Sequence, residues 1–148
     1  MQYGTIEREL HIDASPEVVF DVVSNPEHVC EWWADEADYP PEPGGDGWLA
    51  FGDKRVRFTV ADAVPPRLFS FRWTHEDGET ATAANSNLVV FELEPAGSGT
   101  LLRFTETGFR ERGWDEARAA EVHADHSSGW DHYLPRLVGR AEAVGSPA

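Results

Sequence analysis

The chain has 148 residues, a length that fits one domain, and 41% of them are hydrophobic, which is enough for a packed core. Its net charge of −15 and isoelectric point near 4.6 disfavour binding to nucleic acid or to anionic lipid, since such a surface repels phosphate groups. No apolar run approaches the roughly 18 residues of a membrane helix, the N-terminus shows no signal-peptide pattern, and Cys30 alone forms no intramolecular disulfide, so we expect a cytoplasmic protein without membrane insertion.

The N-terminal third predicts one strand followed by two short helices. Apolar and polar residues alternate over 3–12, which is typical of a strand. The pairs Ser15-Pro16 and Asn25-Pro26 each join an N-cap residue to a proline suited to the first helical position. The second of these helices is expected to reach Trp33.

The middle of the chain predicts strands joined mostly by short links. Residues 34–47 are rich in proline, glycine and acidic residues, which predicts a long exposed loop, and a second polar loop is expected over 75–84. We expect these two loops to form a mobile mouth, because neither contains an apolar anchor. The predicted strands cover 48–51, 54–64, 67–75, 86–94 and 100–107.

A long amphipathic helix is predicted from Trp114 to about Arg140. Its C-terminal half carries an apolar stripe made of Trp130, Tyr133, Leu134, Leu137, Val138 and Ala141. The same face upstream is small or polar, with Ala119, His123, His126 and Ser127. This contrast predicts a helix that closes the core at one end and lines a cavity at the other, while residues 144–148 are expected to form a flexible tail after a single domain over 1–143.

The order of these elements favours an α+β fold. Strands connected by hairpins pair in antiparallel fashion, and a single long helix must bury its apolar stripe against them. We therefore predict a curved antiparallel sheet wrapped around the C-terminal helix, with two short helices after the first strand.

Four stretches resemble the START-like, helix-grip superfamily (SRPBCC), in the branch named after the activator of the heat-shock-protein-90 ATPase. They are IDASPEVVF at 12–20, the pair Trp32-Trp33, PPRLFSFRW at 65–73, and residues 99–109 together with Gly129, Trp130 and Leu134. The resemblance implies a cavity between sheet and helix that holds lipids, polyketides, hormones or other apolar molecules. Some members are enzymes and a few eukaryotic members have a chaperone partner, but a fold does not transfer either function.

The candidate ligand-binding residues combine aromatic side chains of the strands and helices with polar ones near them. Any single aromatic residue is more often core than cavity wall, but a set of this size favours a cavity for an apolar or amphipathic molecule. The candidates are Trp33, Trp48, Phe58, Phe71, Trp73, Phe91, Phe104, Glu106, His123, His126, Ser127 and Trp130.

No metal or cofactor is expected. His123 and His126 share a helix face, but no third ligand follows at a matching interval, and Asp125 and Asp131 are expected to point elsewhere. The sequence lacks a glycine-rich phosphate loop, a dinucleotide fingerprint and a glycine-flanked serine nucleophile.

Three classes of function stay open at this point. The first is binding of a small apolar or amphipathic ligand. The second is an enzyme for cyclisation, dehydration or hydrolysis that uses Glu106 with His123 or His126 as an acid–base pair. The third is a chaperone-associated module, which would use the exterior of the sheet and the basic residues Arg55, Arg57, Arg72 and Arg103.

Two charged residues, Arg8 and Glu106, fall on the apolar period of their strands. An unpaired buried charge is costly, and in the resembled fold the first strand pairs with the last. We therefore expect either that Arg8 pairs with Glu106 or that Arg8 reaches solvent.

Overall fold

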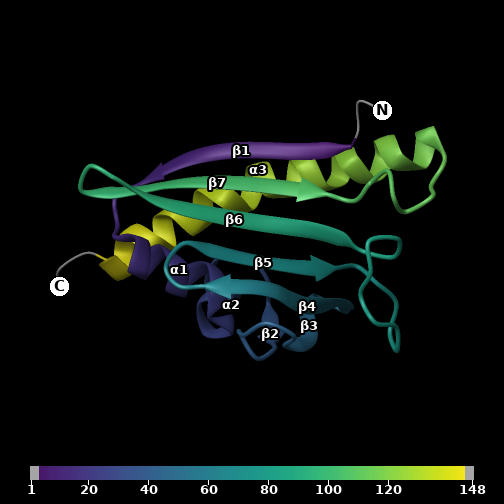
Figure 1. Cartoon of the computed structure of the whole chain (residues 1–148), viewed down its shortest axis with the longest axis horizontal. Helices are drawn as coiled ribbons and strands as arrows, with labels where there is room; N and C mark the ends of the chain where they lie inside the picture. Colours follow the sequence, from purple (N-terminus) through teal and green to yellow (C-terminus); the bar gives the residue numbers. More distant parts are fainter. Residues whose placement is uncertain (1–3, 146–148) are drawn as a thin grey trace.

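The computed structural model describes residues 4–145, which form seven strands and three helices (Figure 1). The strands are β1 (Thr5–Ile12), β2 (Glu36–Asp38), β3 (Asp46–Phe51), β4 (Lys54–Val64), β5 (Leu68–Trp73), β6 (Asn87–Ala96) and β7 (Gly99–Thr107). The helices are α1 (Pro16–Ser24), α2 (Pro26–Trp32) and α3 (Glu116–Gly145).

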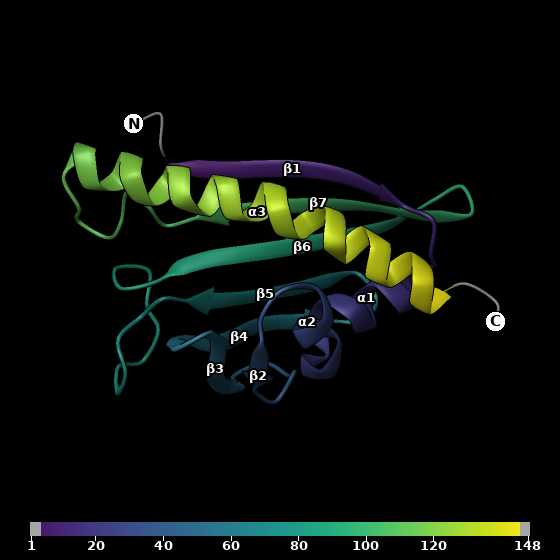
Figure 2. The same cartoon turned by 180° about the vertical axis from the view of Figure 1, so that it is seen from behind.

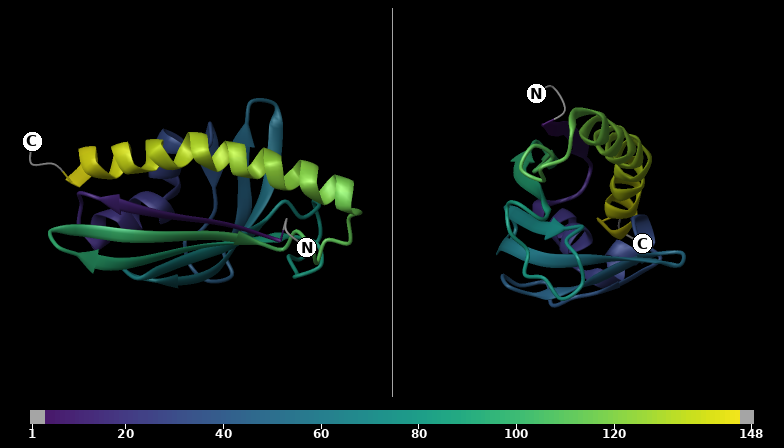
Figure 3. Two further views of the ribbon diagram at one scale, coloured as in Figure 1. Left: turned by 90° about the horizontal axis from the view of Figure 1, so that it is seen from above. Right: turned by 90° about the vertical axis from the view of Figure 1, so that its right-hand side faces the viewer.

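All seven strands belong to one antiparallel sheet in the order β1-β7-β6-β5-β4-β3-β2. The first and last strands pair along their full length, from Thr5 opposite Thr107 to Ile12 opposite Thr100. Seen along its length, the sheet curves around α3 (Figure 3). The predicted α+β helix-grip fold is confirmed.

Helix α3 lies across the concave face of the sheet (Figure 2). Asp115 precedes it, and the Asp115 carboxylate accepts a hydrogen bond from the Arg118 backbone N–H at 2.8 Å, which satisfies one of the free donors of the first turn. The predicted apolar stripe faces the core, with Trp130, Leu134, Leu137 and Ala141 buried. The helix continues to Gly145, into the range predicted as a tail, and residues 146–148 lie outside the described part of the chain.

The two short helices close one end of the sheet and fix the position of Trp33. Asn25 caps α2 by accepting a hydrogen bond from the Glu27 N–H at 3.0 Å, as its sequence predicts. The indole N–H of Trp32, fully buried, donates to the Val22 carbonyl of α1 at 3.0 Å. This bond ties the two helices together, and the chain leaves α2 at Trp33 with that side chain directed into the core.

The prediction of an irregular, unanchored loop over 34–47 is wrong. Three of its residues form β2, which pairs with β3, and Tyr39 is buried at 4% exposure. The Tyr39 hydroxyl donates to the Ser24 carbonyl at 2.7 Å, and its ring centre lies 4.3 Å from that of Phe58. One aromatic anchor and a short edge strand therefore hold a segment whose composition indicates only turns.

Within residues 4–145, no helix is long and apolar enough to cross a membrane.

Candidate functional site

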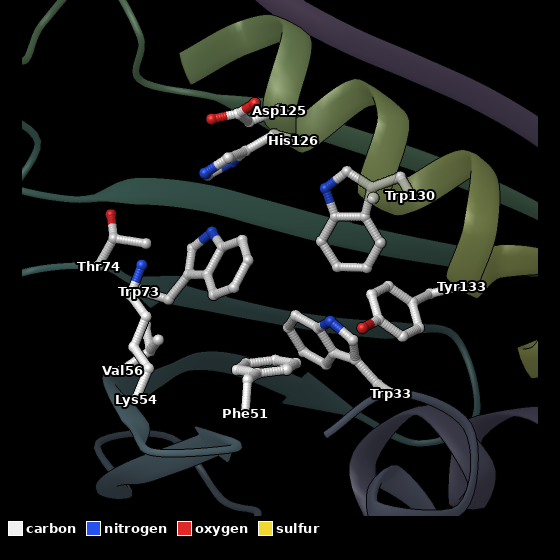
Figure 4. Close-up of a pocket in the computed structure, with 11 residues that line it drawn as sticks. Trp33, Phe51, Lys54, Val56, Trp73, Thr74, Asp125, His126, Trp130 and Tyr133 are labelled. Carbon is white, nitrogen blue, oxygen red and sulfur yellow. The ribbon is translucent and has the colours of Figure 1, made fainter. Parts of the chain in front are cut away.

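A cavity of about 250 Å³ lies between α3 and the sheet, and we call it the apolar cavity. Its walls come from the end of α2, the β3–β4 hairpin, the end of β5 and the middle of α3 (Figure 4). It is lined by Trp33, Phe51, Lys54, Val56, Trp73, Thr74, Asp125, His126, Gly129, Trp130 and Tyr133.

Three indole rings dominate the wall of the apolar cavity. The ring centre of Trp33 lies 4.9 Å from that of Trp130 and 5.1 Å from that of Trp73, and all three side chains are buried. Because each ring packs against the other two, none is free to swing aside. The cavity therefore presents fixed aromatic surfaces, which suit a flat apolar molecule.

Behind these rings lies Glu106, which is fully buried on β7. Its carboxylate accepts hydrogen bonds from the indole N–H groups of Trp73 and Trp130, both at 2.8 Å, and from the Asn87 amide at 3.1 Å. A fourth contact, at 2.9 Å, joins it to Nδ1 of His126. Indole and amide N–H groups only donate, so this cage is built to receive a carboxylate.

The same carboxylate orients His126. Since Glu106 accepts at Nδ1, that nitrogen carries the proton, and Nε2 is the nitrogen left for a ligand. Nε2 has no hydrogen-bond partner among residues 4–145, and the imidazole, 17% exposed, lines the cavity. A buried carboxylate that holds a histidine in one tautomer can support hydrogen bonding or proton transfer at the free nitrogen.

A further layer of contacts supports the cage from the side of the sheet where β5 ends. The guanidinium of Arg112 donates to Thr74 Oγ1 at 2.6 Å and to Asn87 Oδ1 at 3.1 Å. Thr74 has a left-handed backbone with φ of +71°, a conformation that needs such support in a residue with a branched side chain. Arg112 therefore fixes both the wall residue Thr74 and the amide that binds Glu106.

The structure divides the predicted ligand-binding residues into four groups. Trp33, Trp73, His126 and Trp130 line the apolar cavity. Glu106 lies directly behind three of them and holds them in place. The remaining aromatic side chains of the sheet pack elsewhere in the core: Phe58, Phe71, Phe91 and Phe104.

Three other predicted site residues lie away from the apolar cavity. Trp48 packs under the guanidinium of Arg55, 3.9 Å from the ring centre. Nε2 of His123 lies 3.0 Å from the Thr5 carbonyl. The Ser127 hydroxyl accepts from Arg8 at 2.9 Å.

The proposed pairing of Arg8 with Glu106 is wrong. Nε of Arg8 instead forms an ion pair with the carboxylate of Asp131 on α3, at 2.9 Å. Opposite Glu106 in the sheet stands Ile6, not Arg8. The buried carboxylate is balanced by N–H donors and a histidine, and the arginine reaches a partner on the protein surface.

Sequence reasoning missed seven residues of the apolar cavity, and their signals were weak. Asp125 was expected to point elsewhere, but it lines the wall beside His126. Gly129 could have been noticed, because a glycine inside a helix leaves room on one face. The seven are Phe51, Lys54, Val56, Thr74, Asp125, Gly129 and Tyr133.

Only one of the two loops predicted to form a mouth lies next to a cavity. Residues 34–47 line neither the apolar cavity nor a second cavity of about 580 Å³ beside it, whereas Thr74, His75, Glu76 and Asp77 line this second cavity. His75, at the start of the predicted polar loop, is buried at 4% exposure. Of the two predicted loops, only the one after β5 contributes residues to a cavity wall.

The basic residues expected on the sheet exterior are largely engaged within the protein. Arg103 lies between Glu9 and Glu94, at 3.4 and 3.2 Å, and Arg57 pairs with Asp46. Arg55 covers Trp48. A strip of arginines held by carboxylates and rings of the same chain offers a chaperone little unpaired charge.

Across residues 4–145, no group of three or more His, Cys, Asp or Glu side chains is arranged to hold a metal ion.

Comparisons with known proteins agree with this architecture. The sequence model of the family described as "Activator of Hsp90 ATPase homolog 1-like protein" matches residues 13–142. No curated protein matches the chain.

Three solved structures illustrate the likeness in fold. Protein MLL2253 from Mesorhizobium loti has a TM-score of 0.76 and 21% identity, with 94% of this chain and 97% of that one covered. The Aha1 dimer from Colwellia psychrerythraea has a TM-score of 0.75 and 20% identity, with 97% and 98% covered. DynU16, from the dynemicin biosynthetic locus, has a TM-score of 0.73 and 20% identity, with 96% of this chain and 48% of that one covered.

Proposed function

The chain belongs to the Activator of Hsp90 ATPase homolog 1-like family, and we propose that it binds a small, flat, apolar or amphipathic molecule in the apolar cavity. The observation that carries this proposal is the set of three packed indoles around a cavity of about 250 Å³. Ligand sites are typically concave and apolar with a few fixed polar groups, and His126 supplies such a group here. A likeness to a protein from a biosynthetic locus is consistent with this class of ligand, although that likeness concerns the fold.

The proposal predicts that filling the apolar cavity from Gly129 weakens binding. Gly129 lines the cavity, and a Cβ built there meets no atom within 4 Å, so a leucine side chain can leave the helix there and occupy cavity space. We expect Gly129→Leu to weaken binding of naphthylmethanol, a neutral bicyclic probe, by about 10-fold or more, equal to about 1.4 kcal/mol. Isothermal titration calorimetry measures the affinity directly.

Gly139→Leu is the matched control. Gly139 lies in the same helix, is exposed, and a Cβ built there also meets no atom within 4 Å. It lines neither the apolar cavity nor the larger cavity beside it. Both substitutions should raise helix stability by up to about 1 kcal/mol, because leucine favours helix more than glycine does. Equal affinity of both variants for the probe would show that the apolar cavity is not the binding site.

A second candidate function, acid–base catalysis on the bound molecule, is favoured by one observation, the free Nε2 of a histidine held by a buried carboxylate. A nitrobenzisoxazole probe tests it. A base removes the proton from the ring C–H, the electron pair breaks the N–O bond, and a coloured cyanophenolate is released. We expect His126→Gln to slow this reaction by about 10-fold or more, since positioned bases contribute about 10²-fold and upward. His132→Gln, exposed on the same helix, should leave the rate unchanged, and equal rates in both variants would exclude His126 as a base.

A further inference from the structure

A second, larger cavity of about 580 Å³ adjoins the apolar cavity, and we call it the basic chamber. The two share the wall residues Lys54, Val56, Thr74, Asp125 and His126. A molecule seated against the indoles therefore meets the basic chamber directly at one end. His126 stands at the junction, and Lys54 and Thr74, which are labelled with it in Figure 4, line both cavities as well.

The lining of the basic chamber reverses the charge balance of the protein. Five of the chain's 12 lysine and arginine residues line it, but only three of its 27 acidic residues do. The five are Lys54, Arg55, Arg57, Arg112 and Arg118. In a chain with a net charge of −15, this concentration of cations makes the chamber a local positive site that attracts anions.

Three of these cations, Lys54, Arg55 and Arg112, have no carboxylate oxygen within 4.0 Å anywhere in residues 4–145, whereas Arg57 pairs with Asp46 and Arg118 with Glu121. Arg55 lies over the Trp48 ring, 3.9 Å from its centre. Arg112 is half-buried and held by Thr74 and Asn87, so its position is fixed before any ligand arrives. Burial lowers the pKa of its guanidinium, a sign that its charge lacks full compensation, although Glu76 and Glu106 oppose that shift.

The chamber also contains polar groups that lack partners. Among the described residues, the buried side-chain nitrogens without a hydrogen bond are Arg57 Nε and His75 Nδ1, and both residues line the basic chamber. Buried polar atoms without partners are rare in folded proteins. The described part of the chain itself provides neither nitrogen with a partner.

We propose that the basic chamber binds the anionic group of the ligand, so that the molecule recognised is an aromatic acid, with its rings in the apolar cavity and its carboxylate or other acidic group between Lys54 and Arg112. This inference rests on the proposed function, because it needs the apolar cavity to hold the rings. Beyond the proposed function, the inference specifies that the ligand is an anion and that its charged end points toward the basic chamber. His126 lines the wall that the two cavities share.

Three probes with one ring system and different charge test the inference. They are naphthoate, naphthylmethanol and naphthylmethylammonium, each titrated by calorimetry at low salt. We expect naphthoate to bind about 10-fold more tightly than naphthylmethanol, and the ammonium to bind most weakly. The preference should shrink as salt is raised, since the chamber is open enough for its charges to be screened. Naphthyl phosphate, as a fourth probe, shows whether a phosphate is preferred to a carboxylate; tighter binding of either acid than of the alcohol supports the inference.

Substitutions then locate the charge. Lys54→Gln, at an exposed position where folding is not at stake, should weaken naphthoate binding about 3-fold or more and weaken naphthylmethanol binding distinctly less. Arg112→Gln should weaken naphthoate binding more than Lys54→Gln does, if the unfolding of the Arg112 variant stays cooperative. If that variant does not fold, the Lys54 variant alone tests the inference. Arg67→Gln removes the same charge at an exposed position in the β4–β5 turn, at the other end of both strands, and should change neither affinity.

Equal affinity of naphthoate and naphthylmethanol for the unaltered protein would overturn the inference while leaving the proposed function intact. Failure of every naphthyl probe to bind would instead overturn both. A loss of naphthoate affinity in Arg67→Gln as large as that in Lys54→Gln would show a general charge effect and would also contradict a local anion site.

Discussion

Glu106→Gln is expected to lower the free energy of unfolding by about 3 kcal/mol or more. The carboxylate is fully buried and accepts from two indoles and an amide while it holds His126. An amide of the same size has one acceptor oxygen, and its NH₂ group would face groups that only donate. Breaking a buried, charge-assisted network commonly costs about 3–5 kcal/mol.

Chemical denaturation of the Glu106→Gln variant measures this loss, and Glu92→Gln serves as the control. Glu92 lies on the neighbouring strand β6 with its side chain exposed, and the same change there should stay within about 0.5 kcal/mol. A loss below about 1 kcal/mol at Glu106 would mean that the cage does not hold the carboxylate as described.

Trp130→Ala is the second substitution with a large expected effect, about 3–5 kcal/mol of stability. The ring is 2% exposed, and its centre lies 4.6 Å from that of Phe104 and 4.9 Å from that of Trp33. Removing it opens a void in the middle of α3 and leaves Glu106 without one of its donors. Denaturant unfolding again gives the magnitude.

Trp130→Phe separates the ring from its N–H. It keeps most of the packing but removes the hydrogen bond to Glu106, so we expect about 1.5–3 kcal/mol, the range for bonds to charged groups. Trp48→Ala is the control, since Trp48 is only partly buried, under Arg55, and should cost distinctly less than Trp130→Ala. A Trp130→Phe variant as stable as the unaltered protein would contradict the assigned role of this indole N–H.

The fold could be predicted because local patterns and long-range packing agree in this chain. The β4 strand has the predicted bounds of 54–64, since its alternation and the turns at both ends are unambiguous. The caps at Ser15 and Asn25 also act as predicted. The apolar stripe of α3 matches the concave face of one curved sheet, which leaves few other ways to bury it.

The candidate site could be predicted only in part, because its contacts join distant strands. Glu106 was recognised as a buried charge from its place in the alternation, but nothing in the spacing shows that Trp73, Asn87 and Trp130 aim their N–H groups at it. Tyr39 was missed for the opposite reason, since a single anchor does not change a composition typical of turns. The basic chamber forms where a hairpin, a loop and the start of α3 meet, and no local pattern in the sequence marks that meeting.

Glu106 links the fold to the candidate function. Its partners come from β5, β6 and α3, so one carboxylate joins three elements and at the same time fixes two indoles and the imidazole that line the apolar cavity. Stability and binding are therefore expected to change together at this position. At Gly129 and Lys54, which lie on the cavity wall without such contacts, binding should weaken without a loss of stability.

The most direct test of the account is the two-dimensional ¹H–¹⁵N spectrum of the six tryptophan indole N–H groups during a titration with naphthylmethanol. Each indole gives one signal, so the position of the bound rings is visible without any substitution. We predict that the signals of Trp33, Trp73 and Trp130 shift in proportion to occupancy, while that of Trp48, on the outer face of the sheet, stays in place. A saturating titration that moves the Trp48 signal and leaves those of the three cavity indoles unchanged would contradict the central claim that the apolar cavity binds the ligand.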